Sequence, residues 1–161
     1  MQWILSIAFR SAESNELIVL EAIFKALYHS IGYSTILRDA LKVKILYTIG
    51  KVINVTKGNC YEAYKLFTYY SKDRDECVSS LLRKNFVKKM MKCLIVEDSV
   101  IQEHILTCIY DMAVNVDFCL ELRELEWNNS FRYLVELYPK YREAIAYIMV
   151  KLSDVCSYLI V

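Results

Sequence analysis

The residues of this chain that could do nucleophilic, acid–base or metal chemistry are two histidines and six cysteines. The histidines are His29 and His104, and no spacing typical of a zinc site links either one to a cysteine. The six cysteines, none of which belongs to a C-x-x-C pair, are Cys60, Cys77, Cys93, Cys108, Cys119 and Cys156. Several of them fall in apolar helical stripes, where a free cysteine behaves as a small hydrophobic residue. We therefore expect reduced cysteines, no disulfide framework, no metal and no cofactor.

Sequence motifs of the common enzyme classes are also absent. The chain has no glycine-rich phosphate loop, no G-x-S-x-G nucleophile elbow and no H-E-x-x-H zinc motif. Two histidines leave little from which to build a typical hydrolase site. We expect a protein that is not an enzyme and that has no catalytic residues.

The charged residues show one local concentration. The formal net charge is only +1, so no global basic field would draw the chain onto nucleic acid. Lys84, Lys88 and Lys92 fall on one face of an expected helix at a spacing of four, and this face could meet an acidic peptide or a phosphate. A nucleic-acid binder that uses residues 83–92 is the lesser alternative. The simpler interpretation is a solvated convex face, because carboxylates follow closely in the sequence.

The composition favours long helices with short polar connections. Hydrophobic residues make up 56% of the chain and charged residues 24%, which argues against disorder. Three glycines and one proline are too few for the turns of a hairpin-rich β fold. The first ten residues lack a basic leader and an obvious cleavage site, and charged residues interrupt every apolar stretch before it could span a membrane. We expect a cytoplasmic location, with the nucleus as the alternative.

Four glutamates recur at a nearly constant interval: Glu21, Glu62, Glu103 and Glu143 are separated by 41, 41 and 40 residues. The positions two before, two after and five after each glutamate carry mainly apolar residues. These three positions lie on one face of a helix, because they are four and three residues apart. Their residues are Val19, Ile23 and Ala26; Cys60, Tyr64 and Phe67; Ile101, Ile105 and Cys108; and Tyr141, Ile145 and Ile148. A period near 40 indicates repeated helical units.

Two shorter helical segments accompany the glutamate-bearing helices. We expect preceding helices at 3–9, 43–53, 86–96 and 131–138, and following helices at 34–41, 75–82 and 118–125. Candidate N-caps of the long helices are Ser14, Asn15, Asp98 and Ser99, and Pro139 falls near the start of the fourth. The expected repeats, within one domain of residues 1–161, are 1–41, 42–83, 84–125 and 126–161.

Residues 15–31 and 99–113 resemble the long third helix of an armadillo repeat. A short, a medium and a long helix in about 40 residues is the armadillo pattern, and the two-helix HEAT repeat is the nearest alternative. The resemblance implies an all-α fold, a right-handed α-solenoid of about four armadillo-like repeats whose neighbours bury a continuous core. It also implies a concave groove, lined by the long helices, that binds extended peptides.

The groove positions do not carry the residues that importin-like armadillo proteins use. Those proteins place a tryptophan and an asparagine four positions apart on each long helix. The tryptophan-equivalent residues here are Lys25, Leu66, Thr107 and Tyr147, and the asparagine-equivalent residues are His29, Tyr70, Asp111 and Lys151. Because neither ladder is present, a nuclear localisation signal is not the expected ligand. The residues we expect to contact a partner are His29, Leu66, Tyr70, Thr107, Asp111, Tyr147 and Lys151.

The expected function is therefore that of a scaffold or adaptor that binds another protein or a peptide segment along the groove. The apolar end of the sequence, without a polar capping face, is also consistent with a piece of a longer solenoid. The alternative is a compact helical bundle that binds an amphipathic partner helix.

Overall fold

The computed structural model describes residues 2–14, 16–73, 75–125 and 127–158. These residues form helices joined by short turns, and they include no strand, which confirms the expected all-α class. None of the described helices is both long and apolar enough to cross a bilayer. The α-helices are α1 (Gln2–Glu13), α2 (Leu17–Gly32), α3 (Thr35–Val55), α4 (Tyr61–Thr68), α5 (Glu76–Leu81), α6 (Val87–Lys92), α7 (Ser99–Met112), α8 (Val116–Arg123), α9 (Trp127–Leu137) and α10 (Arg142–Tyr158). The shorter turns of helix are η1 (Leu82–Phe86), η2 (Cys93–Ile95) and η3 (Pro139–Tyr141).

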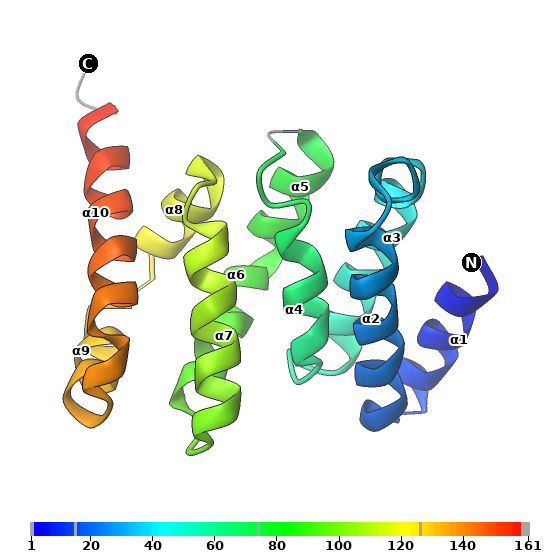
Figure 1. The fold of residues 1–161 in the computed structure, drawn as a ribbon, viewed down its shortest axis with the longest axis horizontal. Coiled ribbons are helices and arrows are strands. Elements are labelled where there is room, and N and C mark those ends of the chain that lie inside the picture. Colours follow the sequence, from blue (N-terminus) through cyan, green and yellow to red (C-terminus); the bar gives the residue numbers. More distant parts are fainter. Residues whose placement is uncertain (1, 15, 74, 126, 159–161) are drawn as a thin grey trace.

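Four helices stand side by side in sequence order along the longest axis of the molecule: α2, α4, α7 and α10 (Figure 1). Each member of this row contacts the next, and α1 packs against α2 and α3 beyond the first member. The four helices carry Glu21, Glu62, Glu103 and Glu143 respectively. The period of about 40 residues in the sequence thus corresponds to one step along the row.

The ends of these helices agree in part with the expected capping residues. Asp98 caps α7, because its carboxylate accepts hydrogen bonds from the backbone N–H groups of Val100 at 2.9 Å and Ile101 at 3.2 Å. Pro139 begins the 3-10 turn that leads directly into α10, where its missing N–H costs little. At α2 the residue before the helix is Glu16, which makes no side-chain cap, so Ser14 is not the cap. Asn15 lies outside the described residues.

The accompanying helices differ from the expectation in the first half of the chain. Segments 34–41 and 43–53, expected as separate helices of two repeats, form the single helix α3. No glycine, proline or polar turn separates the two segments, so nothing in the sequence interrupts the backbone hydrogen bonds there. Ser34 caps this helix by accepting a hydrogen bond from the Leu37 N–H at 3.2 Å. The helix expected at 86–96 is shorter, because α6 passes into the 3-10 turn η2 at Cys93.

A break in the backbone separates α5 from α6. Within η1, Lys84 has φ −87° and ψ 39°, and Asn85 has φ 63° and ψ 15°, which is the left-handed region. The expectation that Lys84 shares one helical face with Lys88 and Lys92 is therefore wrong, since Lys84 precedes the break and the other two follow it. All three lysines are exposed.

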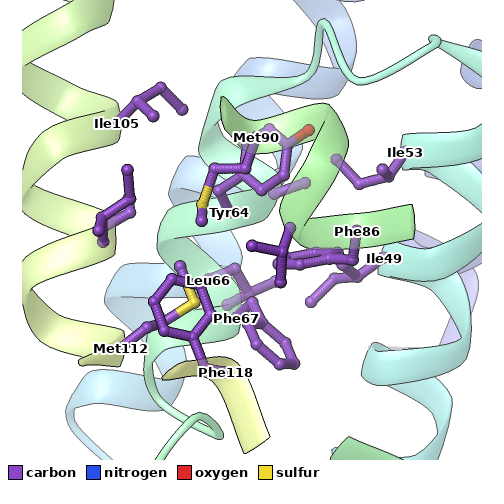
Figure 2. Packing of buried hydrophobic residues seen from close by; sticks show 14 of the residues in the cluster. Ile49, Ile53, Tyr64, Leu66, Phe67, Phe86, Met90, Ile105, Met112 and Phe118 are labelled. Atoms are coloured by element: carbon purple, nitrogen blue, oxygen red, sulfur yellow. The ribbon is translucent and has the colours of Figure 1, made fainter. Parts of the chain in front are cut away.

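The core is continuous from helix to helix along the row. Figure 2 shows Phe86 of η1 close to Ile49 and Ile53 of α3 and to Phe67 of α4. The Phe86 ring centroid lies 4.6 Å from that of Phe67 and 5.1 Å from that of Tyr64. The rings of Phe86, Phe67 and Tyr64 are completely buried or nearly so. Phe86, which follows the break, therefore anchors η1 in the hydrophobic core.

Candidate functional site

An open groove of about 400 Å³ runs over the row of long helices. Residues from α2, α3, α7 and α10, from the last position of α4 and from the turns that follow α4 and α7 contribute to its walls. We refer to it as the long-helix groove; its lining residues are Tyr28, Arg38, Thr68, Tyr69, Lys72, Tyr110, Asp111, Val114 and Tyr147. Because the lining comes from five segments spread over 120 positions of the sequence, the groove exists only when the helices are packed together.

Four tyrosines, which we call the tyrosine ladder, give the groove its aromatic surface: Tyr28, Tyr69, Tyr110 and Tyr147. The Tyr28 and Tyr69 rings are stacked, with centroids 4.5 Å apart and planes at 26°. The Tyr110 and Tyr147 rings lie 4.4 Å apart at 34°. The first pair joins α2 to the turn that follows α4, and the second joins α7 to α10, so the ladder brings together ring faces and hydroxyl groups from the whole row. At Gly32, an added Cβ would collide with the Tyr69 hydroxyl, so glycine leaves the space that this ring needs.

Lysine ammonium groups lie over the ladder at both of its pairs. Lys65 Nζ is 4.8 Å from the Tyr28 ring centroid, and Lys151 Nζ is 5.5 Å from the Tyr147 ring centroid. Cations within about 6 Å of a tyrosine ring are attracted by its negative face. The lysines hold the ring faces in place. Their positive charge would also attract hydrogen-bond acceptors of a ligand that lies on the rings.

Asp111 brings a carboxylate into the same groove. Burial raises its pKa above the usual value, and the positive charges of Lys72 and Lys65 act in the opposite direction. Burial, followed by the neighbouring Tyr28 hydroxyl, raises the pKa of Tyr69 to about 12, so this phenol stays protonated at neutral pH. The groove therefore offers an acceptor at Asp111, donors at the tyrosines and lysines, and flat apolar ring faces.

Five of the seven residues expected to contact a partner lie at or near this groove or are exposed. Asp111 and Tyr147 line it, and Lys151 stands over the Tyr147 ring. His29 is exposed and meets the Tyr28 ring edge-on, with centroids 5.7 Å apart. Thr107 is exposed but does not line the groove, and its hydroxyl donates to the Glu103 carbonyl of its own helix at 2.8 Å.

The expectation is wrong for Leu66 and Tyr70, because both side chains are completely buried. Leu66 lies close to Met112 and Phe118 in the core (Figure 2), and the Tyr70 hydroxyl donates to the Arg38 carbonyl at 3.2 Å. The physical reason is that α4, only eight residues long, is packed against α2, α3 and α7. Little of its surface is left to face the groove.

The residues that do face the groove were present in the sequence as a pattern. Tyr28, Tyr69 and Tyr110 each stand seven positions after a recurring glutamate and are 41 residues apart. The expected groove positions were taken four and eight positions after the glutamates, by analogy with the importin-like ladder. A search for an aromatic residue that repeats at the same interval would have found these three tyrosines; Tyr147, which stands four positions after Glu143, was already among the expected groove residues.

Two of the recurring glutamates, Glu21 and Glu103, make contacts between neighbouring elements of the row rather than lining the groove. The Glu21 carboxylate accepts hydrogen bonds from the Tyr61 N–H at 2.6 Å and the Glu62 N–H at 2.8 Å, at the first turn of α4. The Glu103 carboxylate pairs with Lys140 at 2.5 Å, just before α10. These contacts link one repeat to the start of the next long helix.

Nucleophilic and metal chemistry find no support among the described side chains. Four cysteines of the described region are buried, and burial raises the pKa of Cys93 and of Cys119 to about 11, which keeps their thiols protonated. Within the part of the chain that the structure describes, no group of three His, Cys, Asp or Glu side chains could hold a metal ion.

Comparison of the chain with protein-family models, with curated proteins and with solved structures finds no match.

Proposed function

We propose that this chain is a right-handed α-solenoid of about four armadillo-like repeats that binds an extended segment of a partner protein in the long-helix groove. The observation that carries the proposal is the tyrosine ladder, whose two ring pairs join neighbouring helices along the whole row. A repeated surface of this kind suits a ligand that is itself repetitive, and a polypeptide backbone is such a ligand.

The spacing of the helices in the row fits the length per residue of an extended polypeptide. Packed helices lie about 8–10 Å apart, and an extended chain advances about 3.3–3.6 Å per residue. A bound segment would thus pass one helix of the row for about every three residues. About every third side chain of the segment would meet the next helix of the row, so that affinity accumulates with the length of the segment.

The groups in the groove are of the types that bind peptides well. Tyrosine provides a large rigid contact area at low cost in side-chain entropy and is enriched among the residues that dominate binding energy. The Asp111 carboxylate would accept a backbone N–H of the segment, and Lys72 would donate to a carbonyl or carboxylate. Binding, with no covalent step, uses all of these groups.

Affinity capture from a eukaryotic lysate with mass spectrometry tests the proposal. The double variant Tyr69→Ala, Tyr110→Ala removes one ring from each pair of the ladder. The matched control is Tyr33→Ala, Tyr133→Ala, because both of these tyrosines are exposed and neither lines the groove. Circular dichroism and thermal unfolding establish that both proteins remain helical and folded.

We expect partners that wild type and the control capture and that the ladder variant loses. A photo-reactive benzoylphenylalanine at Thr68 should cross-link to the same partner, whereas one at Ser30 should not. If the ladder variant captures the same partners as the control, the long-helix groove is not the binding site.

A further inference from the structure

A second cavity of about 390 Å³ opens between α3, α5 and η1. It shares no lining residue with the long-helix groove. Its apolar lining includes four buried core residues, Leu46, Ile53, Leu81 and Phe86. Two more apolar residues of its lining, Val43 and Tyr47, are 66% and 60% exposed.

Two lysines, Lys51 on α3 and Lys84 in η1, supply positive charge to this cavity. Neither ammonium group pairs with a carboxylate among the described residues, and Lys51 Nζ lies 5.6 Å from the Tyr47 ring centroid. Glu76 is the acidic residue of the lining, and Arg83 already pairs with it at 2.7 Å. The charge that the cavity offers to a ligand is therefore positive.

The shape of the cavity is fixed by the backbone around it. Lys84 is followed by Asn85 in the left-handed conformation and then by the buried Phe86, so the main chain that carries its side chain is anchored in the core. On the opposite wall, a Cβ at Gly50 would lie 3.0 Å from Leu81 Cδ1, so glycine allows α3 and α5 to approach closely. A cavity held in this way loses little conformational entropy when a ligand enters.

We propose that this cavity binds a small amphiphilic anion, with an aliphatic or aromatic body and one carboxylate or sulfonate group. The body would lie on the apolar lining, and the anionic group would meet Lys51 and Lys84. Ligand pockets are mostly apolar cavities of about 300–1,000 Å³ with a few polar groups that fix orientation, and this cavity has that size and character. The two lysines set the sign of the ligand charge, because an unpaired anion would not enter an apolar cavity without them.

Occupancy of the cavity can be followed through Cys77, because this residue is exposed and belongs to the lining. The other cysteines whose side chains are described are buried. In a Cys156→Ser background, the rate of alkylation by iodoacetamide therefore reports access to Cys77. The two ligands to be used are 8-anilinonaphthalene-1-sulfonate, which fluoresces in apolar sites, and decanoate.

We expect the sulfonate dye to bind the folded protein and to slow alkylation of Cys77, and decanoate to displace it. Decanol and N-phenyl-1-naphthylamine, which lack the anion, should bind at least about tenfold more weakly, because they lose the charge-assisted contact. The double variant Lys51→Met, Lys84→Met should lose about tenfold in affinity for both anions while it keeps its helicity.

A matched control variant, Lys88→Met, Lys92→Met, removes two exposed lysines that do not line the cavity and should bind as wild type does. Ser80→Phe, which would fill the cavity, should abolish binding and also slow alkylation in the absence of ligand. The proposal is overturned if the anions leave the alkylation rate of Cys77 unchanged. Equal affinity of the two lysine variants would overturn it as well, whether or not the Ser80 variant folds.

Discussion

At the scale of single residues, two of the recurring glutamates, Glu21 and Glu103, make contacts between helices. Glu21 accepts the first two N–H groups of α4, so it provides the N-terminal cap that α4 lacks from its own flanking residue, Cys60. A carboxylate at a helix N-terminus satisfies backbone donors that have no partner within the helix and interacts favourably with the helix dipole. The repeat period is visible in the sequence because each long helix must be joined to the next one.

Replacement of Glu21 by alanine should therefore destabilise the protein. We expect the Glu21→Ala variant to lose about 1–2 kcal/mol in the free energy of unfolding, since two buried N–H groups of a short helix lose their acceptor. Urea denaturation followed by circular dichroism measures the loss. Glu13→Ala, at an exposed position near the end of α1, is the control and should unfold as wild type does. Equal midpoints of the two variants would contradict the capping role.

The second residue-scale prediction concerns His104, whose Nε2 lies 3.2 Å from the Tyr61 carbonyl. Burial lowers the pKa of His104 below the ordinary histidine value of 6.5, against the opposing charge of Glu62. The unfolded chain then binds more protons than the folded chain at mildly acidic pH. The contribution of His104 is fully present above pH 6.5 and is lost as the pH falls below it, through the lowered pKa.

The free energy of unfolding, measured by urea denaturation between pH 7 and pH 5, should fall more steeply in wild type than in a His104→Gln variant. Glutamine can still donate to the Tyr61 carbonyl but takes up no proton. His29→Gln, at an exposed position, should keep the slope of wild type. A His104→Gln variant with an unchanged slope would show that the neutral imidazole does not carry the pH dependence.

The sequence predicted the period of the long helices better than it predicted the side chains of the groove. Asp111 and Tyr147 were predicted and line the groove, but Leu66 and Tyr70 are buried. Periodicity fixes which helix a residue belongs to, whereas the rotation of that helix depends on neighbours from other repeats. For α4 those neighbours are α2, α3 and α7, and of these α3 alone is next to α4 in the sequence.

At the scale of elements, the difference between prediction and structure is concentrated in the first two repeats. Residues 34–53 were expected to contain the boundary between two repeats, yet they form the continuous helix α3. The opposite occurs at residues 82–87, where a segment with strong helix-forming residues is broken at Lys84 and Asn85. Asparagine tolerates the left-handed conformation better than most residues, and it is the only local signal of this break.

The break predicts different effects of two substitutions at Asn85. Alanine should cost about 1 kcal/mol in the free energy of unfolding, because a Cβ in the left-handed region meets the following carbonyl without the compensation that asparagine has. Glycine, which adopts this conformation freely, should leave stability nearly unchanged. Thermal and urea unfolding of Asn85→Ala and Asn85→Gly measure the difference. If alanine were the more stable of the two, the segment would be continuous helix in solution.

At the scale of the whole molecule, each helix of the row is stabilised by its neighbours. The core runs through residues of α3, α4, η1, α7 and α8, so no single repeat encloses it (Figure 2). The tyrosine ladder depends on the same packing, because Tyr28 and Tyr69 come from different helices, as do Tyr110 and Tyr147. The groove therefore exists only if the helices pack in a row, which gives the molecule an elongated shape.

Small-angle X-ray scattering of the isolated chain tests whether the molecule is elongated. A compact domain of 161 residues has a radius of gyration of about 15 Å. The row of four long helices predicts a larger value and a pair-distance distribution with an extended tail, because the helices follow one another along a single axis (Figure 1).

The measurement should be made over a range of concentrations, so that association of copies is separated from the shape of the monomer. The Tyr69→Ala, Tyr110→Ala variant should scatter as wild type does, since it removes groove rings and not the core. A monomer at the compact value would mean that the helices close on themselves, and the groove between α2, α4, α7 and α10 could not hold an extended segment.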